Sequence, residues 1–268
     1  MPASMTPTRH PTLRKRARTW RWIATPAAVV FFVLIWRLVG WLGDYPAFIL
    51  PTPEQVTIRL WQVLSDGSLF THIGRTLSEL LLGLALGLST ATPAGYLLAK
   101  SRLLERLLAP YIVASQAVPI IAIAPLIFIW FGPGLLSNVL VTALIVFFPI
   151  LINTVVGLRS VPPELIDLMR SYRATRWQTF CTLELPAALP VLLGGLKIGA
   201  TLAVIGATVG EFVRPSAGLG YLILTAKNRF DTELVFVALI TLAAMALSIY
   251  GAVSLAERQL LSWQKETP

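Results

Sequence analysis

Residues 167–190 read DLMRSYRATRWQTFCTLELPAALP, a polar stretch between two long apolar runs. Its charged residues are Asp167, Arg170, Arg173, Arg176 and Glu184. A chain does not need such a segment to cross a bilayer. We therefore expect the segment to project from the membrane and to dock on another protein. On physical grounds alone, it could instead form an amphipathic helix that lies on anionic lipid.

The composition around this stretch is that of a membrane protein. Hydrophobic residues make up 56% of the chain and charged residues only 13%, whereas soluble domains have about 25% charged residues. Continuous apolar runs of about 20 residues are long enough to span a hydrocarbon core as helices, and a β-barrel would show short alternating segments instead. We predict an all-α polytopic membrane protein with six spans, near 21–43, 73–99, 104–130, 135–157, 187–212 and 233–256.

The third predicted span, 104–130, is interrupted by Pro110, Pro119 and Pro125. Proline removes a backbone donor and kinks a helix, and such breaks persist in a bilayer only where protein or water satisfies the freed carbonyls. We expect this segment to be a kinked packing helix or a broken helix that faces the protein interior.

The basic residues predict the orientation. Six spans place both termini on one side, and most Lys and Arg fall on that side, in residues 9–21, 100–106, 159–176 and 258–265. The positive-inside rule then puts both termini in the cytoplasm, so the net charge of +9 reflects topology rather than a nucleic-acid partner. We expect residues 1–19 to be a disordered basic tail, 20–258 a transmembrane permease domain and 259–268 a second cytoplasmic tail.

The sequence shows no pattern of a catalytic site. It lacks the phosphate-loop motif G-x-x-x-x-G-K-[ST], the motif H-E-x-x-H and any Cys/His cluster, so we predict no catalytic residue, no metal site and no cofactor bound by this chain. Ionisable groups inside a membrane are functional candidates by default. As candidates for a substrate path we name Glu79, Asn153, Lys197 and Glu211; the two glutamates lie near span ends and could instead simply be hydrated.

Glycines recur four residues apart in three places, at Gly83/Gly87, Gly195/Gly199 and Gly206/Gly210. Such spacing lets helix backbones approach closely. It predicts a tightly packed bundle and leaves open a face for self-association.

The polar stretch itself predicts two short helices. Pro163 suits a first helical turn, and Glu164 suits the positive end of a helix dipole, so the first helix is expected over about 163–172. The second is expected from Thr175, with Trp177 on its amphipathic face, to a stop before Pro186.

This segment resembles the cytoplasmic motif of ATP-binding-cassette (ABC) importer permeases, E-A-A-x-x-x-G-x(9)-I-x-L-P. Asp167 takes the place of the motif's acidic residue, Leu183 that of the isoleucine, and Leu185-Pro186 are identical to it. Leu168-Met169 replace the alanine pair and Arg173 replaces the glycine, which puts the conformation of the turn in question. Further segments (124–134, 147–165, 185–212 and 218–223) resemble the nitrate/sulfonate/taurine branch of these permeases, with similarity over roughly 70–255.

The resemblance implies the type I importer permease fold in a bacterial inner membrane, with the loop at about 160–184 docked on a cytoplasmic ATPase dimer that binds ATP and Mg²⁺. It also implies a second permease subunit, expected to be a copy of this chain, and an external substrate-binding protein. The residues expected to contact the ATPase are Glu164, Asp167, Arg170, Arg173, Arg176 and Trp177.

The resemblance further favours a substrate class. Residues 196–213 and the segment around Glu79 are most similar to members that carry riboflavin or a pyrimidine precursor of thiamine. We therefore expect a small vitamin-type heterocycle. The alternatives are anions of the sulfonate, taurine or nitrate type with the same machinery, and more remotely a secondary transporter driven by an ion gradient.

Overall fold

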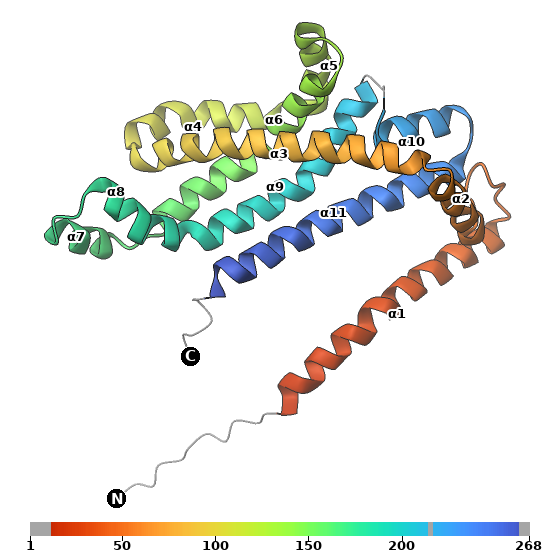
Figure 1. The fold of residues 1–268 in the computed structure, drawn as a ribbon, viewed down its shortest axis with the longest axis horizontal. Helices are drawn as coiled ribbons and strands as arrows, with labels where there is room; N and C mark the ends of the chain where they lie inside the picture. The colour runs from red at the N-terminus through yellow and green to blue at the C-terminus, as the bar shows by residue number, and fades with distance from the viewer. Residues whose placement is uncertain (1–11, 214–216, 263–268) are drawn as a thin grey trace, which may run out of the picture.

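The structure is a computed structural model that describes residues 12–213 and 217–262, and the regular secondary structure of this part of the chain is all helical (Figure 1). The helices run in the order α1 (Thr12–Gly43), α2 (Pro53–Ser65), α3 (Ser68–Lys100), α4 (Arg102–Ala117), α5 (Ile120–Phe131), α6 (Leu135–Arg159), α7 (Pro163–Ser171), α8 (Arg176–Thr179), a π-helical turn (Phe180–Glu184), α9 (Leu185–Val213), α10 (Leu219–Asn228) and α11 (Thr232–Leu260).

Four of the six predicted spans are present as long apolar helices in the described residues. They are α3, α6, the continuous helix Arg176–Val213 that contains α9, and α11. At 33 residues, α3 is roughly 50 Å long at 1.5 Å per residue, which exceeds a hydrocarbon core of about 30 Å. The ends of these helices therefore extend beyond the apolar layer.

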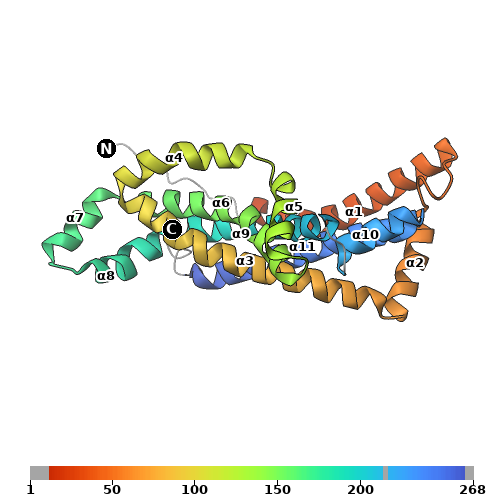
Figure 2. The same ribbon diagram turned by 90° about the horizontal axis from the view of Figure 1, so that it is seen from above.

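The predicted third span is a bent pair. Helices α4 and α5 meet at 94° around Val118 and Pro119 (Figure 2). Proline cannot donate the hydrogen bond that would continue α4, so the break falls where the sequence interrupts the apolar run. The predicted break is confirmed, but the expectation that the segment faces the protein interior is wrong for α4, which has no buried residue.

The predicted first span lies in α1, whose described apolar part is Ala27–Gly43. This helix diverges from the bundle (Figure 1). It contacts the bundle through Trp36, which stacks on Phe236 of α11 at 5.0 Å between ring centroids, and through an ion pair from Arg37 to Glu54 of α2. Because α1 begins at Thr12, residues 12–19 of the expected disordered tail are helical. Residues 1–11 and 263–268 lie outside the described residues.

Helix α6 is the centre of the bundle and packs against both α3 and α9. Both contacts depend on glycine. A Cβ added at Gly95 of α3 would lie 2.7 Å from Cβ of Thr154, and one at Gly206 of α9 would lie 2.7 Å from the Cα of Thr142. The prediction of close packing is confirmed, and these glycines serve contacts within one chain.

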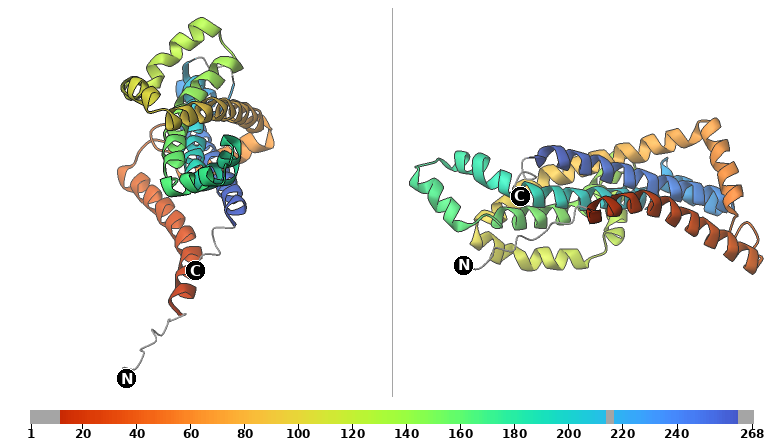
Figure 3. Two further views of the ribbon diagram at one scale, coloured as in Figure 1. Left: turned by 90° about the vertical axis from the view of Figure 1, so that its left-hand side faces the viewer. Right: turned by 90° about the horizontal axis from the view of Figure 1, so that it is seen from below.

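The two ends of the bundle differ in shape. Helices α7 and α8 project from one end, which we call the loop end, whereas α2 and α10 lie at the opposite end, which we call the far end (Figures 2 and 3). The loop end is the part of the molecule that carries the motif residues 167–186, and the far end carries the buried polar groups described below.

Candidate functional site

Helix α7 covers Pro163–Ser171 and confirms the first predicted helix of the loop. The six residues that we expected to face a partner are all exposed: Glu164, Asp167, Arg170, Arg173, Arg176 and Trp177. Among them the structure shows one ion pair, from Arg170 Nη1 to Asp167 Oδ1 at 2.9 Å, with both side chains more than two-thirds exposed. The charges of this surface are therefore directed to solvent.

The turn after α7 has the geometry of a Schellman motif. The N–H of Arg173 donates to the carbonyl of Arg170 at 2.9 Å, and the N–H of Ala174 donates to that of Met169 at 3.0 Å. In this motif the residue just after the end of the helix has a left-handed backbone conformation and is usually glycine. Arg173 takes that position here, with φ 56°. Arg173 therefore adopts the left-handed conformation that glycine favours at this position.

Helix α8 begins with a capping box, in which Thr175 Oγ1 accepts from the N–H of Gln178 at 3.2 Å and Gln178 Oε1 accepts from the N–H of Thr175 at 2.8 Å. This cap fixes the direction of Trp177, which is 72% exposed. Its ring lies 5.7 Å from that of Phe180, which packs edge-on against Tyr96 of α3 at 5.3 Å. Tyr96, Arg176, Trp177 and Phe180 line a hollow beside the loop.

The sequence predicted that the second loop helix stops before Pro186, and this prediction is wrong. It continues through the π-helical turn at 180–184 into α9, and Pro190 also lies inside that helix. The N–H of Leu185 donates to the carbonyl of Phe180, five residues back. A π-helical turn shifts the hydrogen-bond register, which lets the helix pass Pro186 without a break. Leu183 and Pro186 are half-buried in this passage, and Leu185 is 37% exposed.

Two ion pairs that the sequence did not suggest join the loop end to the bundle. Lys100 at the end of α3 pairs with Glu184, which is 4% exposed. Arg159 at the end of α6 binds Glu105 of α4 at 2.7 Å and donates to the carbonyl of Leu98 at 3.1 Å. The mixed charges of these segments are visible in the sequence, but their pairing requires the fold.

The far end contains a buried cluster around two acids, Glu79 of α3 and Glu211 of α9, each 0% exposed. Thr76 donates its hydroxyl to Glu211 Oε1 at 2.6 Å, and the N–H of Gly220 donates to Glu211 Oε2. Arg75 binds Glu79 Oε1 at 2.6 Å. The sequence left open that both glutamates lie near span ends and are hydrated. That alternative is wrong, because neighbouring helices bury both side chains completely.

The start of α10 completes this cluster. The N–H of Leu219 donates to Thr76 Oγ1 at 2.8 Å, and the N–H of Gly218 donates to Nδ1 of His72 at 3.1 Å. These are backbone donors that a helix leaves unpaired at its first turn. A Cβ at Gly220 would lie 2.8 Å from Glu211 Oε2, so the absence of a side chain lets the backbone approach the acid.

The four path candidates do not form one site. The carboxyl groups of Glu79 and Glu211 face each other, but Asn153 donates to the carbonyl of Pro149 within α6 at 2.8 Å, and Lys197 pairs with Glu257 of α11. Thr76, Asn138 and the 218–220 turn were not predicted from the sequence, although polar residues in apolar runs could have indicated the first two. In the described residues no group of three or more His, Cys, Asp or Glu is placed to hold a metal.

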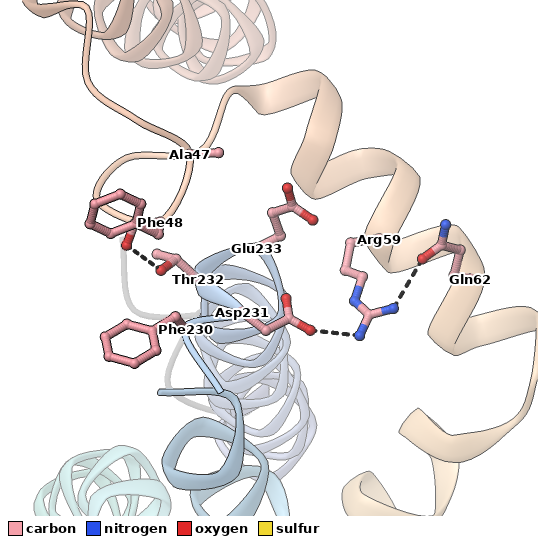
Figure 4. A pocket seen from close by; sticks show the side chains of 8 residues that line it. All are labelled: Ala47, Phe48, Arg59, Gln62, Phe230, Asp231, Thr232 and Glu233. Carbon is pink, nitrogen blue, oxygen red and sulfur yellow. Dashed lines mark hydrogen bonds and ion pairs between the residues drawn. The ribbon is translucent and has the colours of Figure 1, made fainter. Parts of the chain in front are cut away.

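A pocket opens at the far end between α2 and the start of α11 (Figure 4). Arg59 joins its walls, with bonds to Asp231 Oδ2 at 2.6 Å and to Gln62 Oε1 at 3.0 Å. Thr232 donates to the carbonyl of Phe48 at 2.6 Å. Phe48 and Phe230 supply exposed aromatic rings, so the pocket presents both charge and apolar surface to the outside of the bundle.

Comparison with known proteins identifies the family. Residues 68–262 match the family described as "Binding-protein-dependent transport system inner membrane component". The chain belongs to this family. The match begins with α3 and leaves α1 and α2 outside, and it includes both the loop end and the buried acid cluster.

Relatives and a solved structure agree with this assignment. The chain is 49% identical to the riboflavin transport system permease protein RibX of Chloroflexus aurantiacus over 91% of each chain. It is 36% identical to the formylaminopyrimidine transport permease protein ThiX of Halalkalibacterium halodurans, over 88% of this chain and 94% of that one. The inward-facing MetNI methionine ABC transporter has a chain of the same fold, with a TM-score of 0.66 and 21% identity over 73% of this chain and 97% of that one. This protein is therefore an inner-membrane permease subunit of an ABC importer, with the type I fold that the sequence predicted.

Proposed function

We propose that this permease carries riboflavin or a related vitamin-type heterocycle, such as the pyrimidine precursor of thiamine. The observation that supports the proposal is the 49% identity to a riboflavin permease over 91% of both chains. The 36% identity to a formylaminopyrimidine permease points to the same substrate class. A translocation path for an anionic substrate would favour unpaired basic side chains, whereas Lys197 in α9 is paired with Glu257.

An uptake assay tests the substrate class. The permease is expressed with its ATPase and its binding protein in a bacterium that needs external riboflavin and lacks an importer of its own. The proposal is supported if labelled riboflavin is taken up and this uptake is suppressed by unlabelled riboflavin or the pyrimidine precursor. Taurine and nitrate should not suppress it. Uptake of labelled taurine or nitrate instead supports the anion alternative, and uptake that follows the proton gradient without the ATPase supports a secondary transporter.

We further propose that the loop end is cytoplasmic and docks in the clefts of an ATPase dimer, which binds ATP and Mg²⁺. Two copies of this chain form the path, both termini are cytoplasmic, and an external binding protein delivers substrate over the far end and its pocket at Arg59. The support is the exposure of all six loop residues together with the fold match to a transporter permease. ATP can favour one conformation only through contacts that differ between the two states.

The Asp167→Lys variant tests the docking surface. We expect loss of ATPase co-purification and of uptake, since a like charge at a docked site opposes binding. The matched control is Asp167→Lys/Arg170→Glu, which restores the exposed i,i+3 pair with its charges exchanged. If the pair matters only within the loop, the double variant recovers; if the surface docks, it remains defective. Normal uptake and co-purification with Asp167→Lys would reject the assignment.

A further inference from the structure

The two buried acids of the far end contact few positive groups. Glu211 receives its bonds from neutral donors, the Thr76 hydroxyl and the N–H of Gly220. Arg75, with 29% of its side chain exposed, is the one cation in the described residues that binds the pair, and it bonds only to Glu79 Oε1. Two carboxylates therefore face one guanidinium in a protein interior.

Two oxygens of this cluster lack a hydrogen bond. Glu79 Oε2 and Asn138 Oδ1 are both buried and have no hydrogen-bond partner in the described part of the chain. The Glu79 carboxyl faces the side chain of Asn138 and the carboxyl of Glu211. A buried acceptor left without a donor costs about 1–3 kcal/mol, and more when it is charged. A proton on Glu79 Oε2 would turn it from an orphaned acceptor into a donor.

The ionisable and polar groups around the pair come from α3, α6 and α10. On α3 these groups are His72 and Arg75, on α6 the neutral Asn138, and on α10 the backbone donors of 218–220 and Tyr221, which contacts the His72 ring at 5.7 Å. His72 accepts a hydrogen bond at Nδ1 from Gly218, so that nitrogen carries no proton. Arg214 lies outside the described residues.

We propose that Glu79 and Glu211 form a proton-binding site in which one proton, carried by Glu79 Oε2, is shared between the two carboxyls. Two carboxyl groups in one enclosed site hold a single proton because both cannot ionise side by side. With this proton bound, the cluster carries a single negative charge, which faces the positive charge of Arg75. It joins α3 to α9 at the point where Thr76 and Glu211 also hold the start of α10. The proposal does not depend on which substrate the importer carries.

Infrared spectroscopy of the full-length protein in lipid nanodiscs tests the site. A protonated carboxyl has a C=O stretching band that shifts in D₂O, and we expect this band in the wild type at neutral pH. Glu79→Gln and Glu211→Gln should each lose it, because a single remaining acid ionises against Arg75 or the neutral donors. Glu184→Gln is the matched control. Like Glu79, Glu184 is buried, has an Oε2 without a partner and is paired with one cation, Lys100, but it does not belong to a pair of acids, so this variant should retain the band.

Thermal unfolding gives a second readout that does not depend on the band assignment. If the folded state binds a proton that the unfolded state releases, stability falls as pH rises. We expect the melting temperature of the wild type and of Glu184→Gln to fall with rising pH, and that of Glu79→Gln, whose amide retains a donor, to be flatter. Absence of the band in the wild type, or its persistence in Glu79→Gln, would overturn the proposal. A band that appears only in Arg214→Gln would show that Arg214 neutralises two ionised acids instead.

Discussion

The far end and the loop end of this permease satisfy their polar groups in opposite ways. At the far end, Glu79 and Glu211 are fully buried and bonded to α3 and α10 of their own chain. At the loop end, six polar or aromatic residues are exposed, with one ion pair among them. The contrast indicates that the far end is built to hold its own helices together, whereas the loop end is left available to another protein.

The largest expected effect is on the far end. Glu211→Ala leaves the Thr76 hydroxyl and the N–H of Gly220 without their acceptor, and two unpaired buried donors cost about 3 kcal/mol. We expect the free energy of unfolding, measured by SDS titration in mixed micelles, to fall by about that amount. Asp167→Ala, at an exposed acid of the loop end, should change it by less than about 0.5 kcal/mol. Equal losses would remove the distinction between the two ends.

A smaller loss is expected where α9 meets α6. The Cβ of Gly206→Ala would lie 2.7 Å from the Thr142 Cα, and forcing a methyl into such a contact costs about 2 kcal/mol. Gly194→Ala on the same helix meets nothing within 4 Å and should instead stabilise by about 0.5–1 kcal/mol. The same SDS titration measures both. Destabilisation by Gly194→Ala to the same extent would show that helix propensity rather than the close contact decides the result.

For the loop end we expect a loss of affinity without a loss of stability. Trp177 is 72% exposed, and truncating an aromatic at the centre of an interface costs about 2 kcal/mol, or roughly thirtyfold in Kd. The control is Trp61→Ala on α2, where the side chain is 73% exposed at the far end. Titration of the purified ATPase onto permease in nanodiscs should detect the loss for Trp177→Ala alone. Equal affinities for both variants would place the docking surface elsewhere.

The smallest effect is expected in the turn. Arg173 has φ 56°, and a left-handed residue other than glycine costs about 1–2 kcal/mol. Arg173→Gly should slow hydrogen exchange of the α7 amides and Arg173→Ala should not, because alanine retains the strain. Both variants remove the same positive charge, so a change in ATPase affinity common to both reports the charge. Faster exchange with glycine would mean that the Arg173 side chain itself orders the turn.

Much of this architecture was predictable because membrane helices need long apolar runs and proline breaks them. Four spans, the broken α4–α5 segment and helix α7 follow from that logic. The pairing of Glu79 with Glu211 was not predictable, since the two acids are far apart in sequence and only the packing of α3 against α9 brings them together. The continuation of the helix past Pro186 was mispredicted because a π-helical turn leaves no composition signal in residues 180–184.

That π-helical turn joins α8 to α9 in one helix, Arg176–Val213, of 38 residues. At 1.5 Å per residue this helix is roughly 57 Å long, with Trp177 near one end and Glu211 near the other. If this helix stays straight, a small tilt at the loop displaces the acid cluster at its other end. If it bends at the π-helical turn of 180–184, the loop moves without displacing the cluster.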